Sequence, residues 1–341
     1  MKAKGKGKVK NLRGSILIVT LWALAILLLL AVGLAYRVGL ELHLTRYAAD
    51  RLKAFYVAKA GLERAEALLL EEGSSEELVD SFQEKWSKDE TLFKEKEVGG
   101  GFFSVSYSSP QSGDEKRIRY GMEDEESRIP LNSAGSDILQ KIPGLEEEVV
   151  KSIRAWRGDK DLTPEETTRE DNYYASLEKP YSRKGKPLET VEELLLVRGV
   201  TLSLYNALNR FLTVYGSGKV NLNTASAETL EYLGLPKEIV QRIVELRKGE
   251  DGALGTPDDT VFKKVPDLIS PEIIKSLRLD QDQQLGLTNF LSARQGILAV
   301  QSTAFRIQSE GLLRQGGVKK RIVAIVDRSQ KKTVIKYWHE D

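Results

Sequence analysis

The chain has 341 residues, of which 41% are hydrophobic and 30% charged, and its 51 basic side chains almost balance its 50 acidic ones. This composition supports a packed core in about two domains and leaves no overall basic excess for holding a nucleic acid. Cysteine is absent and histidine occurs only as His43 and His339. Disulfides and thiolate zinc sites are thereby excluded, and Ser-His-Asp or histidine-metal catalysis is disfavoured. We therefore expect a protein that is not an enzyme.

The N-terminal segment is typical of a chain that enters a membrane. Residues 1–13 carry six basic side chains and no acidic one, and the 21 residues from Ile16 to Tyr36 carry no charge. As a helix that run is about 31 Å long, which matches a hydrocarbon core of about 30 Å. The basic end predicts a cytoplasmic N-terminus, with the rest of the chain on the other side of the membrane.

Three interpretations fit this segment. The first is a plain transmembrane anchor. The second is a secretory signal removed near Gly33-Leu34-Ala35, although the apolar run is long for one. The third is a prepilin-type signal, in which the chain is cut between Gly14 and Ser15 and the apolar helix is kept.

A helical pattern continues without proline as far as Leu70. It predicts one long helix over residues 15–72, with its membrane part at 15–36. The second half carries an apolar stripe with spacings of three and four residues, which is typical of a helix packed on a domain. An ordinary anchor followed by a coiled-coil stalk is the alternative. The stripe includes Ala48, Leu52, Phe55, Ala58 and Leu62.

Strand patterns occur in two groups that are far apart in the sequence. Alternation at residues 103–107 and 118–122 predicts a hairpin, and residues 305–313, 318–326 and 334–337 predict three more strands. Because an isolated two-stranded hairpin is marginally stable in water, we expect the two groups to join into one antiparallel sheet backed by the long helix. The segment between them is then a large helical insertion.

The insertion contains an internal repeat. Leu131-Asn132-Ser133-Ala134 begins one copy and Leu222-Asn223-Thr224-Ala225 begins the other, and each copy predicts a helix, a tight turn and a second helix. Ser133 and Thr224 are the expected N-caps.

Each repeat resembles a DNA-binding helix-hairpin-helix. In those proteins a turn with two glycines exposes N–H groups to a phosphate. Here the turns are Gly144-Leu145-Glu146 and Gly234-Leu235-Pro236, and the second glycine is missing from both. We therefore expect no nucleic acid partner and interpret the repeats as packing modules.

Two acidic segments follow the repeats. Residues 249–260 combine four carboxylates with three glycines, and close carboxylates with turning backbone favour Ca²⁺. The expected ligands are Asp251, Asp258 and Asp259, with Glu250 as a fourth; a solvated acidic turn is the alternative. A second segment lacks the glycines and gives a weaker metal hypothesis; its residues are Asp159, Asp161, Glu170 and Asp171.

Taken together, these features resemble the minor pseudopilin K family of type II secretion systems. The resemblance depends on Arg13-Gly14-Ser15 before the apolar run and on the large insertion. It also depends on the segments at 121–132, 220–225 and 251–259. It implies an α+β, pilin-like fold divided into a leader (1–14), the long helix (15–72), two parts of a pilin-like domain (73–127 and 293–341) and an inserted domain of helical hairpins (128–292).

The resemblance also implies a role. Prepilin peptidase would cut before Ser15 and methylate it, leaving a single-pass inner-membrane protein with most of its mass in the periplasm. Most pseudopilins have Glu at the fifth mature position, where this chain has Val19, as is usual for a subunit at the fibre tip. The implied partners are the minor pseudopilins I and J, bound by the stripe of the long helix, and the major pseudopilin fibre. A membrane-tethered DNA-uptake or type IV pilus protein is the alternative function.

Overall fold

The computed structural model describes residues 13–73, 79–109, 117–314, 317–330 and 332–341. Residues 1–12 of the predicted leader, and much of the two predicted hairpin turns at 110–113 and 315–317, lie outside the described residues. The chain divides into two compact units, Met1–Lys53 and Ala54–Asp341, and each is described by itself.

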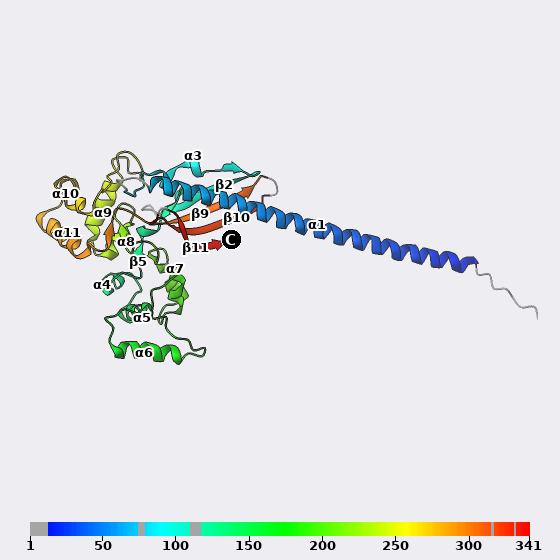
Figure 1. Cartoon of the computed structure of the whole chain (residues 1–341), viewed down its shortest axis with the longest axis horizontal. Helices are drawn as coiled ribbons and strands as arrows, with labels where there is room; N and C mark the ends of the chain where they lie inside the picture. The colour runs from blue at the N-terminus through cyan, green and yellow to red at the C-terminus, as the bar shows by residue number, and fades with distance from the viewer. Residues whose placement is uncertain (1–12, 74–78, 110–116, 315–316, 331) are drawn as a thin grey trace, which may run out of the picture. The chain divides into compact units, whose positions relative to one another are not determined.

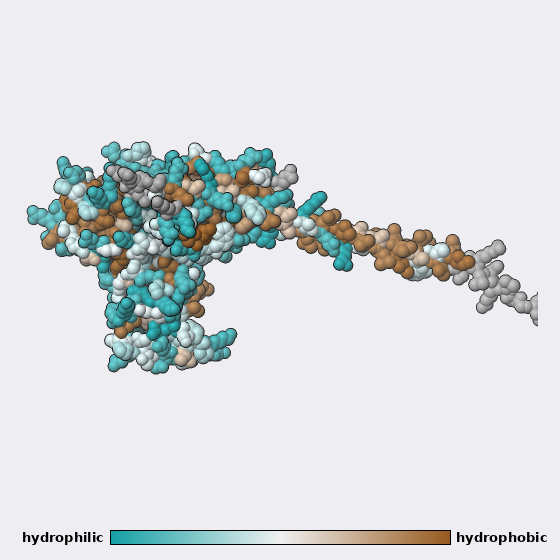
Figure 2. Space-filling model, in the orientation of Figure 1, coloured by the Kyte–Doolittle hydropathy of each residue, from teal (hydrophilic) through white to brown (hydrophobic). Residues whose placement is uncertain are grey.

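Helix α1 (Arg13–Glu72) is a single helix of 60 residues, as the uninterrupted helical pattern predicts. In the first unit its large apolar side chains are exposed, as the brown stretch in Figure 2 shows. This is one helix long and apolar enough to cross a membrane, with a mean hydropathy of 2.9 in its most apolar window. Gly14 and Ser15 fall in its first turn.

The second unit contains the predicted antiparallel sheet (Figure 1), and the two strand groups do join. The strand order is β1-β2-β9-β10-β11, with β3 paired to β2 and β4 to β9. The junction is the β2–β9 ladder, which runs from Gly101 opposite Leu313 to Val105 opposite Ser309. The strands are β1 (Lys96–Val98), β2 (Gly101–Ser109), β3 (Arg117–Tyr120), β4 (Glu123–Asp124), β9 (Ala304–Leu313), β10 (Lys319–Asp327) and β11 (Val334–Glu340).

The C-terminal part of α1 packs on this sheet. A Cβ atom on Gly311 would lie 2.3 Å from the Ala54 carbonyl oxygen, so only glycine allows the helix backbone to come this close to β9. The Ser309 hydroxyl donates to the Ala58 carbonyl oxygen at 2.6 Å. One hydrophobic core results; it includes Ala58, Leu62, Leu69, Phe103, Val105 and Ile307, with Trp86 and Phe93 from the short helices α2 (Lys85–Lys88) and α3 (Glu90–Phe93).

The insertion has a separate core, whose members lie between Ile129 and Leu298. Besides the predicted helices it contains two short parallel strand pairs, β5–β6 and β7–β8, which the sequence analysis did not predict. The two strands of each pair are separated in the sequence by helices, so local pattern does not show that they pair. The elements are η1 (Glu125–Ser127), β5 (Ile129–Pro130), α4 (Ser136–Leu139), α5 (Glu147–Arg157), α6 (Pro164–Ala175), η2 (Val191–Leu196), α7 (Leu202–Leu208), β6 (Leu212–Thr213), β7 (Val220–Asn221), α8 (Ala227–Leu233), α9 (Lys237–Arg247), η3 (Val265–Ile269), α10 (Pro271–Leu277), α11 (Gln281–Arg294) and β8 (Leu298–Ala299).

Candidate functional site

The two predicted repeats use their asparagines in the same way. Asn132 donates from Nδ2 to the Leu188 carbonyl oxygen at 2.9 Å and accepts from the Leu188 N–H at 2.8 Å. Asn223 makes the same pair of bonds to Phe262, at 3.0 and 2.9 Å. A side-chain amide can satisfy one residue's donor and acceptor together. Each asparagine therefore holds the loop that follows its own helical hairpin.

The arginine that ends each hairpin turns back to the beginning of its repeat. Arg157 Nη1 donates to the Leu131 carbonyl oxygen at 2.6 Å, and Arg247 Nη1 donates to that of Leu222 at 3.2 Å. The two arginines differ in their other surroundings. Arg157 pairs with Asp159 through Nε and Nη2, at 2.5 and 2.7 Å, whereas burial lowers the pKa of Arg247 to about 10.

The predicted N-caps are wrong by two residues. The N-cap residues of α4 and α8 are Gly135 and Ser226. The Ser133 hydroxyl instead donates to the Gly218 carbonyl oxygen, and the Thr224 hydroxyl donates to the Asp124 carboxylate. Both hydroxyl groups therefore bond to residues far away in the sequence. Local spacing alone cannot distinguish a hydroxyl that makes such a contact from one that caps a helix.

The hairpin turns offer little to a phosphate. Leu145 and Leu235 at the turn centres are buried. Glu146 is the N-cap of α5, and two further glutamates lie in the first turn of that helix. Pro236, the N-cap of α9, has no N–H to donate. Acidic side chains at a helix N-terminus oppose anion binding, so the geometry agrees with a packing role.

The first acidic loop brings three of its four predicted ligands together. Asp251, Asp258 and Asp259 each place one carboxylate oxygen so that all three lie within 4.8 Å of one another. Glu250 is not part of this group; it contributes its backbone N–H, which donates to Asp258 Oδ2 at 2.7 Å. A Cβ atom on Gly249, whose φ is +62°, would lie 2.3 Å from that same oxygen. Glycine is therefore required there for the loop to close.

Hydrogen bonds hold this loop in shape and on the sheet domain. The Thr256 hydroxyl contacts a carboxylate oxygen of Asp258 and one of Asp259, both at 2.8 Å. Two hydrogen bonds lower the pKa of Asp258: the larger effect comes from the Thr256 hydroxyl and the smaller from the backbone N–H of Asp251. Gln83 Nε2 donates to the carbonyl oxygens of Thr256 and Asp259, at 2.8 and 3.1 Å. These hydrogen bonds hold the carboxylate groups of the loop in place, as a preorganised cation site requires.

The sequence analysis missed a cluster of buried carboxylates between the sheet and the insertion. We call Asp80, Asp124, Glu126 and Arg328 the junction cluster; all are less than a tenth exposed. Arg328 Nη2 donates to both carboxylate oxygens of Asp80, at 2.5 and 2.6 Å. Glu126 Oε1 accepts from the N–H and the hydroxyl of Thr303, at 2.6 and 2.7 Å. Of the three carboxylates, Asp80 pairs with the guanidinium, while Glu126 is satisfied by neutral donors.

Asp124 links the junction cluster to the second repeat. Its Oδ2 accepts from Asn221 Nδ2 at 3.1 Å, from the Thr224 hydroxyl at 2.5 Å and from the Ser302 hydroxyl at 2.7 Å. Burial, together with the charges of Asp80 and Glu126, raises its pKa to about 7, although the hydrogen bonds from Thr224 and Ser302 lower it. Strands β4 and β7 place Asp124 and Asn221 here, so the acidic run and the Leu-Asn repeat meet at the junction cluster.

Comparison with known proteins finds relatives of this chain in one secretion system. Residues 135–217, within the insertion, match the family described as type II secretion system (T2SS), protein K. A curated relative, type II secretion system protein K of Aeromonas hydrophila, is 24% identical over 236 residues, which cover 63% of this chain and 68% of that protein. A chain of the GspK-GspI-GspJ complex from the enterotoxigenic Escherichia coli type 2 secretion system has the same fold, with a TM-score of 0.60 and 14% identity; the match covers 87% of this chain and 99% of that one. The chain is thus similar to type II secretion protein K over part of its insertion and shares the fold of a chain of that complex.

Within this protein K fold, the predicted partner-binding stripe is only partly available. Ala58 and Leu62 are 0% and 1% exposed because they pack on the chain's own sheet. The prediction that these two residues bind a partner is therefore corrected. Phe55 is half-buried and contacts Trp338 edge-to-face, while Ala48 and Leu52 remain exposed.

The second predicted metal site does not form. Its carboxylates are separately paired with arginines: Asp159 and Asp161 with Arg154, Glu170 with Arg198, and Asp171 with Arg183. Glu170 is also buried against the Ser152 hydroxyl at 3.1 Å. Guanidinium charges already neutralise these groups, so they do not converge on a cation. The spacing of acids in the sequence gave no sign of the arginines that fold against them.

Proposed function

We propose that this chain is a non-enzymatic tip subunit of the type II secretion pseudopilus, where it initiates and caps fibre assembly for protein export. The observation that carries the proposal is the position of the insertion within the second unit. Helix α1 enters this unit at Ala54, beside Gly311 near the end of β9. It ends at the other end of β9, where Gly73 lies next to the Arg328 side chain.

The insertion leaves the sheet at this same end. Strand β4, which leads into it, pairs with the first residues of β9 through Asp124 opposite Phe305. The insertion has its own core and adds its bulk beyond the end of α1. A further subunit stacked on that end would have to occupy the same space. A position above all other subunits removes this conflict. It also fits Val19, because a subunit at the tip has no subunit above it whose α-amino group a glutamate at this position would neutralise.

The proposed partners are the pseudopilins I and J. A related fold is found in the GspK-GspI-GspJ complex, and here α1 keeps exposed apolar side chains such as Leu52 and Tyr56, 57% and 59% exposed. Such side chains in a periplasmic helix indicate a protein contact. We place the N-terminus in the cytoplasm, α1 in the inner membrane and the second unit in the periplasm, after cleavage by prepilin peptidase between Gly14 and Ser15 and methylation of Ser15.

Co-purification tests these partners. The full chain, extracted in detergent, is expected to retain pseudopilins I and J, and Leu52→Glu should reduce their recovery about tenfold by placing a charge in an apolar contact. Leu285→Glu is the control, because Leu285 is also exposed, at 61%, but lies on α11 in the insertion. Equal recovery with both variants would exclude α1 as the binding helix.

We also propose that the first acidic loop binds Ca²⁺ through Asp251, Asp258 and Asp259. Carboxylate oxygens are the donors this ion prefers, and it needs several more from carbonyl groups or water. The bound charge would remove the repulsion among the three carboxylates and hold the loop against the sheet domain through Gln83.

Calcium is therefore expected to raise the melting temperature of the wild-type chain by about 5 °C over the value in chelator. Asp258→Asn should abolish this difference because it removes a charged ligand while keeping the side chain's size. Glu250→Gln is the matched control in the same loop and should keep the difference, since Glu250 lies outside the carboxylate group. A calcium response retained in Asp258→Asn would exclude the site; differential scanning fluorimetry measures both.

A further inference from the structure

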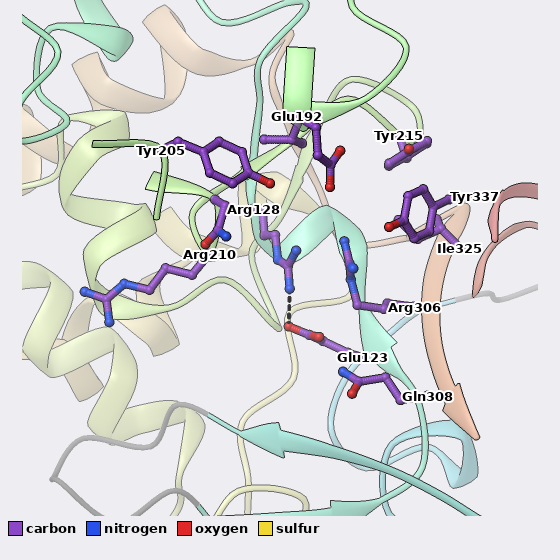
Figure 3. A pocket seen from close by; sticks show the side chains of 12 residues that line it. Glu123, Arg128, Glu192, Tyr205, Arg210, Tyr215, Arg306, Gln308, Ile325 and Tyr337 are labelled. Atoms are coloured by element: carbon purple, nitrogen blue, oxygen red, sulfur yellow. Dashed lines mark hydrogen bonds and ion pairs between the residues drawn. The ribbon is translucent and has the colours of Figure 1, made fainter. Parts of the chain in front are cut away.

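A polar pocket opens between the insertion and the sheet, with a volume of about 260 Å³. Figure 3 shows its walls: Glu192 from η2, Tyr205 from α7, Tyr215, and Tyr337 from β11. Because pockets for drug-sized ligands exceed about 300 Å³, this volume suits a single side chain or a small ion. The tip proposal makes no use of this pocket.

Two of the three arginines that line the pocket pair with carboxylates of the same chain. Arg128 Nη2 lies 2.6 Å from Glu123 Oε1 (Figure 3), and Arg306 Nε lies 2.9 Å from Glu125 Oε2. Arg210 points away from the centre and stacks on Phe211, with 4.3 Å between its Cζ atom and the ring centroid. Arg128 and Arg306 therefore already have carboxylate partners, and Arg210 does not face the centre of the pocket.

Glu192 is the unbalanced charge. Among the described residues no lysine or arginine forms an ion pair with it, and its side chain is exposed at the pocket wall beside Tyr205. Together with burial, its negative charge raises the pKa of Tyr205, Tyr215 and Tyr337. A carboxylate that lines the same pocket as three tyrosine rings is complementary to a cation. The carboxylate attracts the cation directly, and ring faces attract it through their quadrupoles.

Tyr215 supplies a second sign of a missing partner. Its hydroxyl oxygen is buried and has no hydrogen-bond partner within the part of the chain that the structure describes. A buried hydroxyl without a partner is costly, and native structures normally satisfy it. Its ring contacts that of Tyr337, with centroids 6.3 Å apart. An incoming N–H group would satisfy the Tyr215 oxygen while its charge meets Glu192.

Exposed leucines beside the pocket indicate that the cation comes from a protein. Leu195 lies three residues after Glu192 in the 3₁₀ helix η2, and Leu202 lies three residues before Tyr205 in α7. Residues three apart share a face in both kinds of helix. Leu195 and Leu202 are 41% and 64% exposed. A free amine would leave these side chains in water, whereas a protein surface would cover them.

We propose that this pocket receives a lysine or arginine side chain of a protein partner, whose apolar surface covers Leu195 and Leu202. Glu192 binds the charge, Tyr215 accepts a hydrogen bond, and Tyr205 and Tyr337 form the walls. This interface is distinct from the α1 contact and does not depend on it.

The first experiment tests the pocket chemistry on the full chain in detergent, with n-butylammonium and methylguanidinium as probes. Ring signals of Tyr205, Tyr215 and Tyr337 in ¹³C-tyrosine NMR are expected to shift saturably with both cations and not with acetate. Glu192→Gln should weaken binding about fivefold, and Tyr215→Phe, which keeps the ring, about threefold. Glu245→Gln, an exposed glutamate on α9, should bind as the wild type does. Equal binding by Glu192→Gln, or equal shifts with acetate, would overturn the proposal.

The second experiment identifies the source of the cation. A photoreactive benzoylphenylalanine at Leu202, in the full chain in its native membrane, should cross-link to one protein at a peptide that contains lysine or arginine. The cross-link should be lost with Glu192→Gln and kept with Glu245→Gln. A cross-link that is absent, or unaffected by Glu192→Gln, would overturn the proposal of a protein partner even if the small cations bind.

Discussion

Replacing Asp80 with alanine is expected to lower the free energy of unfolding by about 3–5 kcal/mol. Asp80 is 1% exposed, and both its carboxylate oxygens accept from Arg328 Nη2. Oδ2 also accepts from the Ser302 N–H at 2.7 Å. Without the carboxylate, a guanidinium that is 8% exposed loses its counter-ion, and a buried N–H loses its acceptor. Leaving a buried charge unpaired costs much more than removing a whole ion pair.

Chemical denaturation of the variants followed by circular dichroism measures this loss. Asp171→Ala is the matched control, because Asp171 pairs with Arg183 at 2.7 Å but is 52% exposed, so its loss should cost less than about 1 kcal/mol. Adding Arg328→Met to Asp80→Ala should recover part of the stability by removing the unpaired charge. Equal losses in Asp80→Ala and Asp171→Ala would show that the junction cluster does not join the sheet to the insertion.

Replacing Asp124 with asparagine is expected to reduce the pH dependence of stability. The pKa of Asp124 in the folded chain is about 7, above its usual 3.8, chiefly because of burial. Between these two values the folded state binds more protons than the unfolded state, so stability falls as pH rises from about 4 to about 7. The fall amounts to up to about 4 kcal/mol for this one group. Asparagine does not ionise and removes this contribution.

Thermal unfolding of both chains from pH 4 to pH 8 measures the difference. Glu72, whose pKa burial also raises to about 7, adds a similar trend to both proteins, so the comparison isolates Asp124. The melting temperature of Asp124→Asn should fall less between pH 4 and pH 7 than that of the wild type. Asp282→Asn, an exposed aspartate on α11, should follow the wild-type profile. A parallel profile for Asp124→Asn would show that Asp124 stays ionised across this range.

The fold could be predicted where local pattern and burial agree. Alternation at Phe103, Val105 and Tyr107 corresponds to three buried side chains of β2, and residues 305–313 to β9. Helix α1 was predicted almost to its last residue because nothing between Ile16 and Leu70 breaks it. The repeat is visible in the sequence because both copies keep the same residue types at matching positions. In the structure the asparagine and the arginine of each copy bond to backbone carbonyl groups of their own half of the insertion.

The rest depended on contacts between segments far apart in the sequence. Nothing near Glu170 in the sequence shows that Arg198, 28 residues away, pairs with it, so an acidic segment resembled a metal site. Thr224 resembled an N-cap, yet it binds Asp124, 100 residues away. The burial of the acidic run at 123–126 was not predicted, since charged residues are rarely buried without partners. Its partners include Asn221 of β7 and Arg306 of β9.

The position of this chain in the assembled fibre tests the account most directly. Pseudopili assembled with the full-length protein can be labelled with gold-conjugated antibody to an epitope tag after Asp341 and viewed by electron microscopy. The tip proposal predicts label at one end of each fibre and few fibres when the protein is absent. Label distributed along the fibre, or normal fibre numbers without the protein, would contradict it.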